Sequence, residues 1–319
     1  MLAMNPKFNE TGLLQEFQSI SGLSVKISEP LARYTSIKVG GPADYFIEVE
    51  SEAALAQLLS LLSLRAMPFC LLGNGSNVVI SDLGVEGVLI HLAGHFKHAE
   101  WHEEAKESWV EAGAAQAVTQ LVRQAARRGY GGLEFAEGIP GSVGGALVMN
   151  AGAYGSEFEK VVETVYGRNQ QGSSIQFNRE QMRFTYRDSH LPPGTVVTRV
   201  RLSLHRQESS KVSMKVRELV TKRKSSQPSG YPNSGSMFRN PPDDYAGRLV
   251  EAAGLKGKQI GRAQISPKHG NFIINLGGAS AEDVRQLMEL ARAEVNAQFG
   301  VLLTPEVKLI GRWPSAKAE

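Results

Sequence analysis

The amino-acid sequence predicts a mixed α+β protein built in two blocks. Helix-type and strand-type hydrophobic patterns follow one another along the chain, without an internal repeat or a low-complexity tract. The polar stretch from His205 to Ser210 separates the two blocks. A length of 319 residues fits two or three domains, and 42% hydrophobic with 21% charged residues is ordinary for a protein that buries a core.

The first block opens with strand and helix patterns in turn. Residues 45–49 are typical of a strand, and Ser51 is placed to cap a helix that ends before Pro68. Further strands are predicted at 69–72, which we expect to be buried, and at 78–80, 88–92 and 109–111. An amphipathic helix then ends at Gly129, and its apolar side carries Val118, Leu121, Val122 and Ala125.

The segment from Gly131 to Gly155 fits neither kind of pattern. It is short of charge, rich in Gly and Ala, and has neither a helical nor a strand period. We therefore expect a loop that wraps a ligand rather than an element of the core. Strands resume at 174–177 and 196–204, and the second of these alternates between a polar and a more apolar side.

The second block begins with a helix over Val212 to Val220. A loop rich in Ser, Pro and Gly follows at 225–242, and a short helix near 245–253 is closed by Gly254. After a strand at 272–275, Ser280 and Asp283 resemble a capping box that opens a long helix. Gly300 ends that helix, and residues 306–310 are predicted as the last strand.

Charge and cysteine content exclude several functional classes. The net charge of +3 and pI near 8.9 arise from mixed charges without a long basic block, which favours an ordinary solvated surface over nucleic-acid binding. One cysteine excludes an internal disulfide, and Cys70 lies in an apolar run that favours an inert buried thiol over a nucleophile. No set of His, Asp and Glu has metal-ligand spacing, so we expect no metal.

Targeting and membrane signals are missing from the pattern as well. Met1 to Gly12 has no apolar core behind a basic stretch, so we expect no signal peptide. The most apolar stretch, 55–64, is interrupted by polar residues and is too short to span a bilayer. The sequence therefore predicts a cytoplasmic protein with no membrane partner.

A glycine-containing loop at 73–77 is the first candidate binding element. It follows an apolar strand and precedes another strand, and its backbone N–H groups and small polar side chains can cradle a diphosphate. A plain tight turn explains the Asn-Gly pair equally well. The loop is not a dinucleotide-binding fingerprint, because the Gly-x-Gly-x-x-Gly spacing and a following helix are both missing, and there is no P-loop.

The glycine-rich run from Gly138 to Gly155 is a stronger candidate. So many residues without side chains lose much conformational entropy on folding, and a purely structural loop rarely needs them all. Close approach of a flat or phosphorylated cofactor explains the run better than structure alone.

Six motifs follow one another along the chain. They are the segment Tyr34 to Ala43, Leu72-Gly73-Asn74-Gly75-Ser76-Asn77, the 138–155 run, Tyr186-Arg187-Asp188-Ser189, Gly235-Ser236-Met237-Phe238-Arg239-Asn240-Pro241, and Pro305-Glu306-Val307-Lys308. Together they resemble the UDP-N-acetylenolpyruvoylglucosamine reductase family, from about Tyr34 to Gly311. Chance is a poor explanation for six motifs in the family's order.

The resemblance implies a fold and a domain plan. An FAD-binding region of the vanillyl-alcohol-oxidase type, made of two α+β subdomains, is expected at 1–90 and 91–207, and a C-terminal α+β substrate-binding domain at 208–319. Only Pro-Pro-Gly-Thr lies between Leu191 and Val196, so the long inserted loop of one family subtype is missing. The chain is thus similar to the shorter subtype, and any substrate contact made by that insert must come from elsewhere.

The resemblance also implies the reaction and the cofactors. NADPH reduces a non-covalently bound FAD, and UDP-N-acetylglucosamine enolpyruvate is then reduced to UDP-N-acetylmuramate, a step of peptidoglycan precursor synthesis. Hydride goes to the terminal vinyl carbon, and a proton goes to the carbon that carries the ether oxygen. The substrate and NADPH are the expected partners, and we expect a monomer. An FAD oxidase of the same superfamily and a non-catalytic flavin-binding module are the alternatives; neither has a reason to keep all the later motifs.

Three residues match the family's catalytic positions. Arg187 matches the arginine that stabilises negative charge, although spacing alone favours an ion pair with Asp188. Ser236 matches the proton donor, although spacing alone favours a turn residue. Glu306 matches the glutamate that supports protonation, against a solvated carboxylate at a strand end. Which of Lys222, Arg223 or Lys224 assists Ser236 is left open.

Two further groups are expected to bind ligands. The residues expected to contact FAD are Tyr34, Gly40, Gly73, Asn74, Gly75, Ser76, Asn77, Gly138, Gly141, Ser142, Gly144, Gly145, Asn150, Gly152, Ala153 and Gly155. The polar candidates for the UDP-sugar are Tyr186, Asn240, Lys256, Gln264, His269 and Asn271. Lys256 suits a diphosphate best, because its ammonium is a flexible point charge, whereas His269 alone is more typical of a structural histidine.

Overall fold

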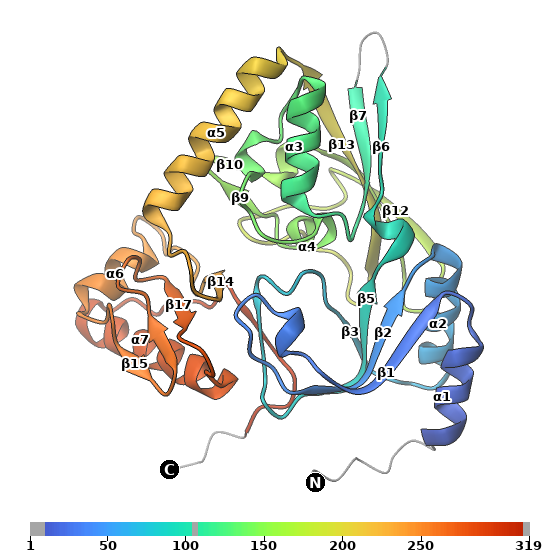
Figure 1. Ribbon diagram of the computed structural model, residues 1–319, viewed down its shortest axis with the longest axis horizontal. Helices are drawn as coiled ribbons and strands as arrows, with labels where there is room; N and C mark the ends of the chain where they lie inside the picture. The colour runs from blue at the N-terminus through green and yellow to red at the C-terminus, as the bar shows by residue number, and fades with distance from the viewer. Residues whose placement is uncertain (1–9, 104–107, 315–319) are drawn as a thin grey trace.

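A computed structural model describes residues 10–103 and 108–314 of the chain. Figure 1 shows the elements gathered into three regions, with the first region in blue, the second mainly in green and the third in orange. The stretch in which we expected no signal peptide lies mostly outside the described residues. Within the described part, no helix combines the length and apolar character that a membrane span requires.

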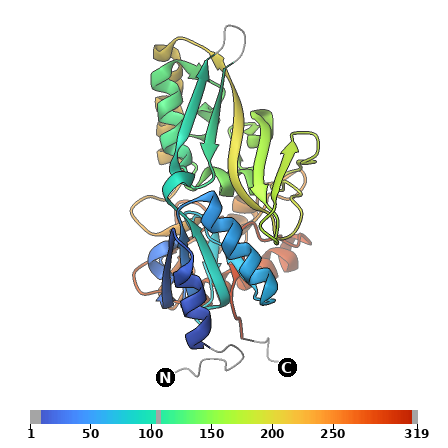
Figure 2. The same ribbon diagram turned by 90° about the vertical axis from the view of Figure 1, so that its right-hand side faces the viewer.

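The first region is a four-stranded sheet with two helices. The strand order is β1-β2-β5-β3, formed by β1 (Leu23–Pro30), β2 (Pro42–Val49), β5 (Val85–Leu92) and β3 (Phe69–Leu71). Only the β1–β2 pair is antiparallel. Figure 2 shows helices α1 (Glu10–Ser19) and α2 (Glu52–Leu64) in front of this sheet. The Ser51 hydroxyl accepts a hydrogen bond from the backbone N–H of Ala54, which confirms the predicted cap.

The prediction of a buried strand at 69–72 is wrong, because β3 is the edge of its sheet. Leu71 is 37% exposed, and Phe69 and Cys70 are only partly buried. An edge strand has a neighbour on one side only, so an apolar sequence does not guarantee burial there. Burial is still sufficient to raise the pKa of the Cys70 thiol to about 11, which fits the predicted inert thiol.

The second region is an antiparallel sheet with helices packed against it. Its strand order is β12-β11-β13-β7-β6, and the short β8 (Tyr130–Gly131) pairs with β13 outside this order. The five strands are β12 (Ser174–Asn178), β11 (Val162–Arg168), β13 (Val196–Arg206), β7 (Ser108–Gly113) and β6 (Ala99–Glu103). Helix α3 (Val118–Arg128) ends at Gly129, whose φ of 73° is the left-handed conformation that glycine favours. Helix α5 (Ser209–Ser226) packs on α3.

Helix α5 bears on the predicted domain limits. Val212 and Val216 belong to the hydrophobic core shared by the first and second regions. The helix that follows the polar stretch therefore packs against elements that precede it in the sequence. The limits at 90 and 207 remain a prediction.

The glycine-rich segment contains more regular structure than we predicted. Helix α4 (Val143–Val148) lies within it, and β9 (Gly152–Ala153) pairs with β10 (Ser156–Glu157). The Ser142 hydroxyl caps α4 by accepting from the backbone N–H of Gly145. A helix of six residues is too short to show a hydrophobic period, which is why the expectation of a plain loop is wrong here.

The third region has its own sheet and core. The sheet order is β14-β17-β16-β15, from β14 (Asn233–Ser236), β17 (Phe272–Asn275), β16 (Ala263–Ile265) and β15 (Gln259–Ile260), with helices α6 (Ala246–Ala252) and α7 (Ala281–Phe299). Both hydrogen bonds of the predicted capping box between Ser280 and Asp283 are present. Its core also takes in Ile37 and Val39 from the 34–43 motif, so that motif joins the first region to the third.

The last strand returns to the first region. β18 (Lys308–Ile310) pairs in parallel with β4 (Val78–Ile80). It begins two residues later than the predicted strand, so Glu306 lies just before the strand. This crossing places Lys308 beside the loop at 73–77, because its backbone N–H donates to the carbonyl oxygen of Asn77.

Candidate active site

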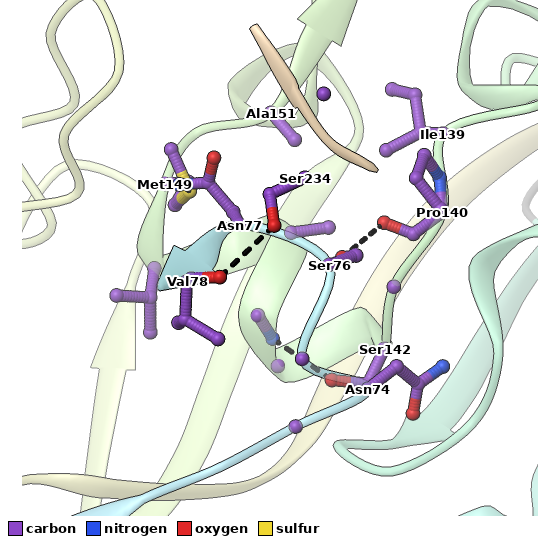
Figure 3. Close-up of a pocket in the computed structure, with 18 of the residues that line it drawn as sticks. Asn74, Ser76, Asn77, Val78, Ile139, Pro140, Ser142, Met149, Ala151 and Ser234 are labelled. Carbon is purple, nitrogen blue, oxygen red and sulfur yellow. Dashed lines mark hydrogen bonds between the residues drawn. The ribbon is translucent and has the colours of Figure 1, made fainter. Parts of the chain in front are cut away.

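A cavity of about 700 Å³ lies where the three regions meet. Its wall includes the loop 73–77 from the first region, the segment 139–154 with Arg187 from the second, and Ser236 with Glu306 from the third. Figure 3 shows the two glycine-containing segments facing each other across part of this wall. A volume of this size suits a cofactor or a drug-sized ligand.

The loop 73–77 is held by contacts to both other regions. The Ser76 hydroxyl donates to the carbonyl oxygen of Pro140 over 2.6 Å (Figure 3). The Asn77 amide donates to the carbonyl oxygen of Glu306 over 3.1 Å. Gly75 has a φ of 61°, and a Cβ there would lie 2.1 Å from the carbonyl oxygen of Tyr34. The backbone path of this loop therefore requires glycine at that position.

Gly144 and Gly145 stand next to each other but have different surroundings. A Cβ on buried Gly144 would lie 2.9 Å from the Cβ of Ala114, so this glycine allows α4 to pack against the chain after β7. A Cβ on exposed Gly145 would meet only the Ser142 hydroxyl, at 3.3 Å. Both line the cavity, but only Gly145 is exposed, and the one atom that its Cβ would meet belongs to a side chain.

The wall fits a flat, phosphorylated cofactor. Eleven of the residues expected to contact FAD line it, namely Gly73, Asn74, Gly75, Ser76, Asn77, Gly141, Ser142, Gly144, Gly145, Gly152 and Ala153. Most of them have no side chain beyond Cβ or a small polar one, so the backbone itself forms the surface that a ligand can approach. Within the described residues, no group of three or more metal-ligating side chains occurs.

The other five residues expected to contact FAD lie outside the cavity lining. The Tyr34 ring stacks on Phe46 and its hydroxyl donates to Glu29. Asn150 is fully buried, and its amide donates to Glu157 and to the carbonyl oxygen of Thr185. The remaining three are the glycines Gly40, Gly138 and Gly155, each with a positive φ. A direct contact of these five with FAD stays a prediction.

Arg187 occupies a tight turn. Thr185 and Asp188 exchange backbone hydrogen bonds across it, and Arg187 has a φ of 59°, which is unusual for a residue with a side chain. Its Nε donates to Oε1 of Glu306 over 3.1 Å, and a terminal nitrogen donates to the carbonyl oxygen of Gly152 over 3.2 Å. The ion pair is thus with Glu306, at the cavity, and not with the neighbouring Asp188 that spacing alone favoured.

Glu306 is largely buried beside the cavity. Its side chain is 15% exposed, and its backbone N–H donates to the carbonyl oxygen of Met237 over 2.8 Å. That bond joins it to the residue that follows Ser236. Burial raises the pKa of Glu306, and the positive charges of Arg187 and Arg239 offset part of this effect.

Ser236 ends β14 opposite Phe272 and lines the cavity. Among the described residues its hydroxyl has no hydrogen-bond partner, so it is available to a ligand. Of the three basic residues left open by the sequence, only Arg223 lines the cavity. Lys222 instead places its ammonium over the ring of Tyr154, and the carbonyl oxygen of Lys224 accepts from Lys268.

The six residues predicted to contact the UDP-sugar lie outside this cavity lining. Most of them make internal hydrogen bonds or ion pairs: Asn240 accepts from Ala246, Lys256 pairs with Glu251, Gln264 donates to Gly257, His269 accepts from Asn271, and Asn271 bonds both backbone groups of Phe238. Tyr186 lies under the guanidinium of Arg187. Their contacts with the substrate stay predictions.

The cavity wall also contains three basic side chains that were not expected from the sequence, namely His91, Lys97 and Lys308. A signal existed for Lys308, because it belongs to the same short motif as Glu306. His91 and Lys97 lie outside the recognisable motifs, and only the fold brings them to the cavity.

Comparison with known proteins assigns both parts of the chain. Residues 227–310 match the family model of the UDP-N-acetylenolpyruvoylglucosamine reductase C-terminal domain, and residues 43–169 match that of the FAD binding domain. A Symbiobacterium thermophilum protein named UDP-N-acetylenolpyruvoylglucosamine reductase 2 is 43% identical over 291 residues, which are 91% of this chain and 93% of that protein. A Myxococcus xanthus protein with the name UDP-N-acetylenolpyruvoylglucosamine reductase is 41% identical over 304 residues, 95% and 97% of the two chains.

A solved structure agrees with these matches. The crystal structure of UDP-N-acetylenolpyruvylglucosamine reductase from Thermus caldophilus superposes with a TM-score of 0.76 at 38% identity. The alignment covers 90% of this chain and 98% of that one. The predicted α+β fold, an FAD-binding region followed by a C-terminal domain, is confirmed.

Proposed function

The chain belongs to the UDP-N-acetylenolpyruvoylglucosamine reductase family, and on that premise we propose that Arg187, Ser236 and Glu306 carry out its reaction at the cavity between the three regions. The protein is an FAD-dependent oxidoreductase that uses NADPH to reduce UDP-N-acetylglucosamine enolpyruvate to UDP-N-acetylmuramate, a step of peptidoglycan synthesis. The observation that carries the proposal is that these three residues and both glycine-containing segments line one cavity.

FAD supplies the redox chemistry when bound, because it takes a hydride from NADPH and passes it to the enolpyruvyl double bond. The loop 73–77 and the segment 141–153 would hold it, since their glycines and small polar residues form the wall. What remains for the side chains is to orient the substrate, to stabilise charge and to deliver one proton.

Arg187 stabilises the negative charge that develops on the substrate carboxylate. Its side chain is 17% exposed, and its guanidinium is fixed by Glu306 and by the carbonyl oxygen of Gly152, so it need not reorganise during the reaction. A fixed cation that is largely buried stabilises an enolate more strongly than a cation that is surrounded by water does.

Glu306 supports the protonation step. Because burial raises its pKa, it retains a proton to a higher pH than an exposed glutamate does, and Arg187 limits that rise. Its backbone bond to Met237 holds it beside the residue that follows Ser236. We propose that it exchanges a proton with the serine hydroxyl, directly or through a water, because both residues line the cavity.

Ser236 delivers the proton to the carbon that carries the ether oxygen. A hydroxyl is a weak acid, so it can protonate only a strongly basic carbon, and the enolate carbon is one. The hydroxyl has no other partner among the described residues, and Arg223 on the same wall is the candidate to assist it.

The experiment that tests this function is an anaerobic titration of the purified yellow protein. NADPH should bleach the flavin absorbance, and UDP-N-acetylglucosamine enolpyruvate should restore it within one turnover with formation of UDP-N-acetylmuramate. A flavin that is reoxidised by air but not by the enolpyruvyl ether would favour an oxidase instead and would overturn the proposal.

The setting of the reaction is part of the proposal. The substrate and NADPH are both soluble nucleotides, so we propose a cytoplasmic enzyme whose partners are these two molecules. One chain supplies every residue named above, which fits a monomer. Neither nucleic acid nor membrane is required.

A further inference from the structure

Arg239 lies where three segments of the site meet. Its backbone N–H donates to the carbonyl oxygen of Thr304 over 2.9 Å, which ties it to the segment before Glu306. A terminal nitrogen of its side chain donates to the carbonyl oxygen of Arg187 over 3.2 Å. Its Nε is buried and has no hydrogen-bond partner among the described residues.

The bond to the Arg187 carbonyl matters because of the backbone there. Arg187 has a φ of 59°, a left-handed conformation that costs energy for a residue with a Cβ, so the surroundings must hold it. The ends of the turn are held by the Thr185–Asp188 backbone bonds and by the Asn150 amide, which donates to the carbonyl oxygen of Thr185. Arg239 contacts the carbonyl oxygen of Arg187 itself. If the turn relaxed, the guanidinium of Arg187 would move away from Glu306.

The charge of Arg239 also reaches Glu306. Two positive charges act on this carboxylate, Arg187 from the 185–188 turn and Arg239 from the segment after β14. Nearby charged groups are Glu157, which pairs with Arg187, and Asp188, on which the charges of Arg239 and Lys308 act, while Lys308 and Arg223 line the same cavity. Of these, Arg187 and Arg239 lower the pKa of Glu306 against the effect of burial. Arg239 thus acts on both members of the ion pair.

We propose that Arg239 is a positioning residue of this site, which fixes the turn that carries Arg187 and places a second positive charge beside Glu306. The proposal rests on the proposed function in one respect only, namely that the Arg187–Glu306 pair serves the reduction of the enolpyruvyl ether. The coupling between Arg239 and Glu306 itself is a property of the folded protein and can be measured without substrate.

Three substitutions separate the two effects. Arg239→Gln removes the charge, whereas Arg239→Lys keeps the charge but ends one bond short of the terminal nitrogen that donates to the Arg187 carbonyl. Arg292→Gln is the matched control, because Arg292 also donates to a backbone carbonyl, that of Leu303 in the same segment, but is not among the groups that shift Glu306.

The first measurement is a carbon-13 NMR titration of the glutamate carboxyls in the oxidised yellow protein, with the Glu306 signal identified by its loss in Glu306→Gln. Arg239→Gln should move the Glu306 midpoint to higher pH, while Arg239→Lys and Arg292→Gln should leave it near that of the wild type. An unmoved midpoint in Arg239→Gln, or an equal shift in Arg292→Gln, would refute the electrostatic part.

The second measurement is stopped-flow absorbance of the two half-reactions. Arg239→Lys should slow reoxidation by the enolpyruvyl ether on the order of a hundredfold, as expected for a catalytic group displaced by about 1 Å, and should leave reduction by NADPH nearly unchanged. Wild-type rates in both half-reactions would overturn the positioning part. If Arg239→Gln does not fold, Arg239→Lys still decides this part.

The two proposals fail in different ways. A wild-type protein that the enolpyruvyl ether cannot reoxidise would overturn the proposed function, whatever the NMR titration shows. A wild-type enzyme with the expected turnover but no effect of Arg239 on Glu306 or on the rate would overturn only the role of Arg239.

Discussion

Single residues at the cavity combine features that stability alone does not explain. Arg187 is held in a left-handed conformation, Glu306 is a largely buried carboxylate, and Ser236 presents a hydroxyl without a protein partner among the described residues. Residues in unfavourable states tend to cluster at functional sites. The following two predictions concern these residues.

Ser236→Ala should reduce turnover by at least on the order of a hundredfold, the usual range for a positioned general acid. Reduction of the flavin by NADPH should be almost unchanged, because no proton from Ser236 is needed there. Ser236→Cys should recover part of the rate, since a thiol is a stronger acid but its longer bonds misplace it. Stopped-flow measurement of both half-reactions checks this, and near-normal turnover of Ser236→Ala would assign the proton to another donor.

Removing either member of the Arg187–Glu306 ion pair should also affect one half-reaction much more than the other. Arg187→Ala and Glu306→Ala should each slow reoxidation by substrate about a hundredfold or more, because one preorganised charge is lost while reduction by NADPH stays close to normal. The matched control is Arg168→Ala, which breaks a part-buried ion pair with Glu52 outside the cavity lining. Equal damage to both half-reactions would indicate a structural role for the pair.

Individual elements place the ligands, and α4 is the clearest case. Its two glycines point in different directions, Gly144 towards Ala114 and Gly145 towards the cavity. The glycine-rich sequence alone cannot distinguish them. Substituting each in turn therefore tests which glycine serves packing and which serves the cofactor.

Gly145→Val should yield a folded protein that no longer retains flavin, because the new methyl groups enter the cavity. Gly144→Val should instead destabilise the fold by about 1–3 kcal/mol, the usual cost of overpacking, since its side chain would overlap Ala114. The ratio of flavin to protein absorbance and the thermal unfolding midpoint measure the two effects. A fully yellow Gly145→Val protein would contradict the cofactor-binding role of this wall.

The turn before β17 contains a histidine that should make the stability of the protein depend on pH. Burial, and then the charge of Lys256, lower the pKa of His269 below its ordinary 6.5, and its Nδ1 accepts the backbone N–H of Asn271. Between the lowered pKa of His269 in the folded protein and its pKa of 6.5 in the unfolded chain, the unfolded chain binds more protons than the folded protein. The free energy of unfolding should therefore fall as the pH drops through that window.

The substitution His269→Asn tests this effect. The side-chain oxygen of asparagine can still accept a hydrogen bond from the backbone N–H two residues later, but asparagine does not titrate. The pH dependence of the unfolding midpoint should therefore be flatter in His269→Asn than in the wild type. His98→Asn, at an exposed site, is the control, and an equally flat curve there would remove His269 as the cause.

The whole molecule is organised around the cavity, because each of its three regions supplies part of the wall. The strand β18 closes this arrangement by crossing from the third region to β4 of the first. A ligand in the cavity therefore contacts all three regions and should stabilise them together.

Removal of FAD should accordingly lower the thermal unfolding midpoint, and added FAD should restore it. A ligand at about 100 times its dissociation constant contributes roughly 2.7 kcal/mol to folding stability. Acid precipitation should release all of the yellow colour, since we predict no covalent link. Flavin that stays in the protein pellet, or an apoprotein as stable as the holoprotein, would contradict the prediction.

Local features of the chain were determined by the sequence alone. The caps at Ser51 and Ser280, the helix ends at Gly129 and Gly300, and most strands follow from short-range patterns, because they depend on residues a few positions apart. The family, and with it the candidate roles of Arg187, Ser236 and Glu306, also follows from short motifs that can be recognised one at a time.

Only the tertiary structure decided which of these features meet. Arg187 and Glu306 are 119 positions apart and form one ion pair, which no spacing rule could join. The position of β3 at a sheet edge, the different surroundings of Gly144 and Gly145, and the place of Arg239 behind the turn likewise depend on how distant segments pack. The physical reason is that burial and charge at a site are set by neighbours in space, and the chain brings these together only when it folds.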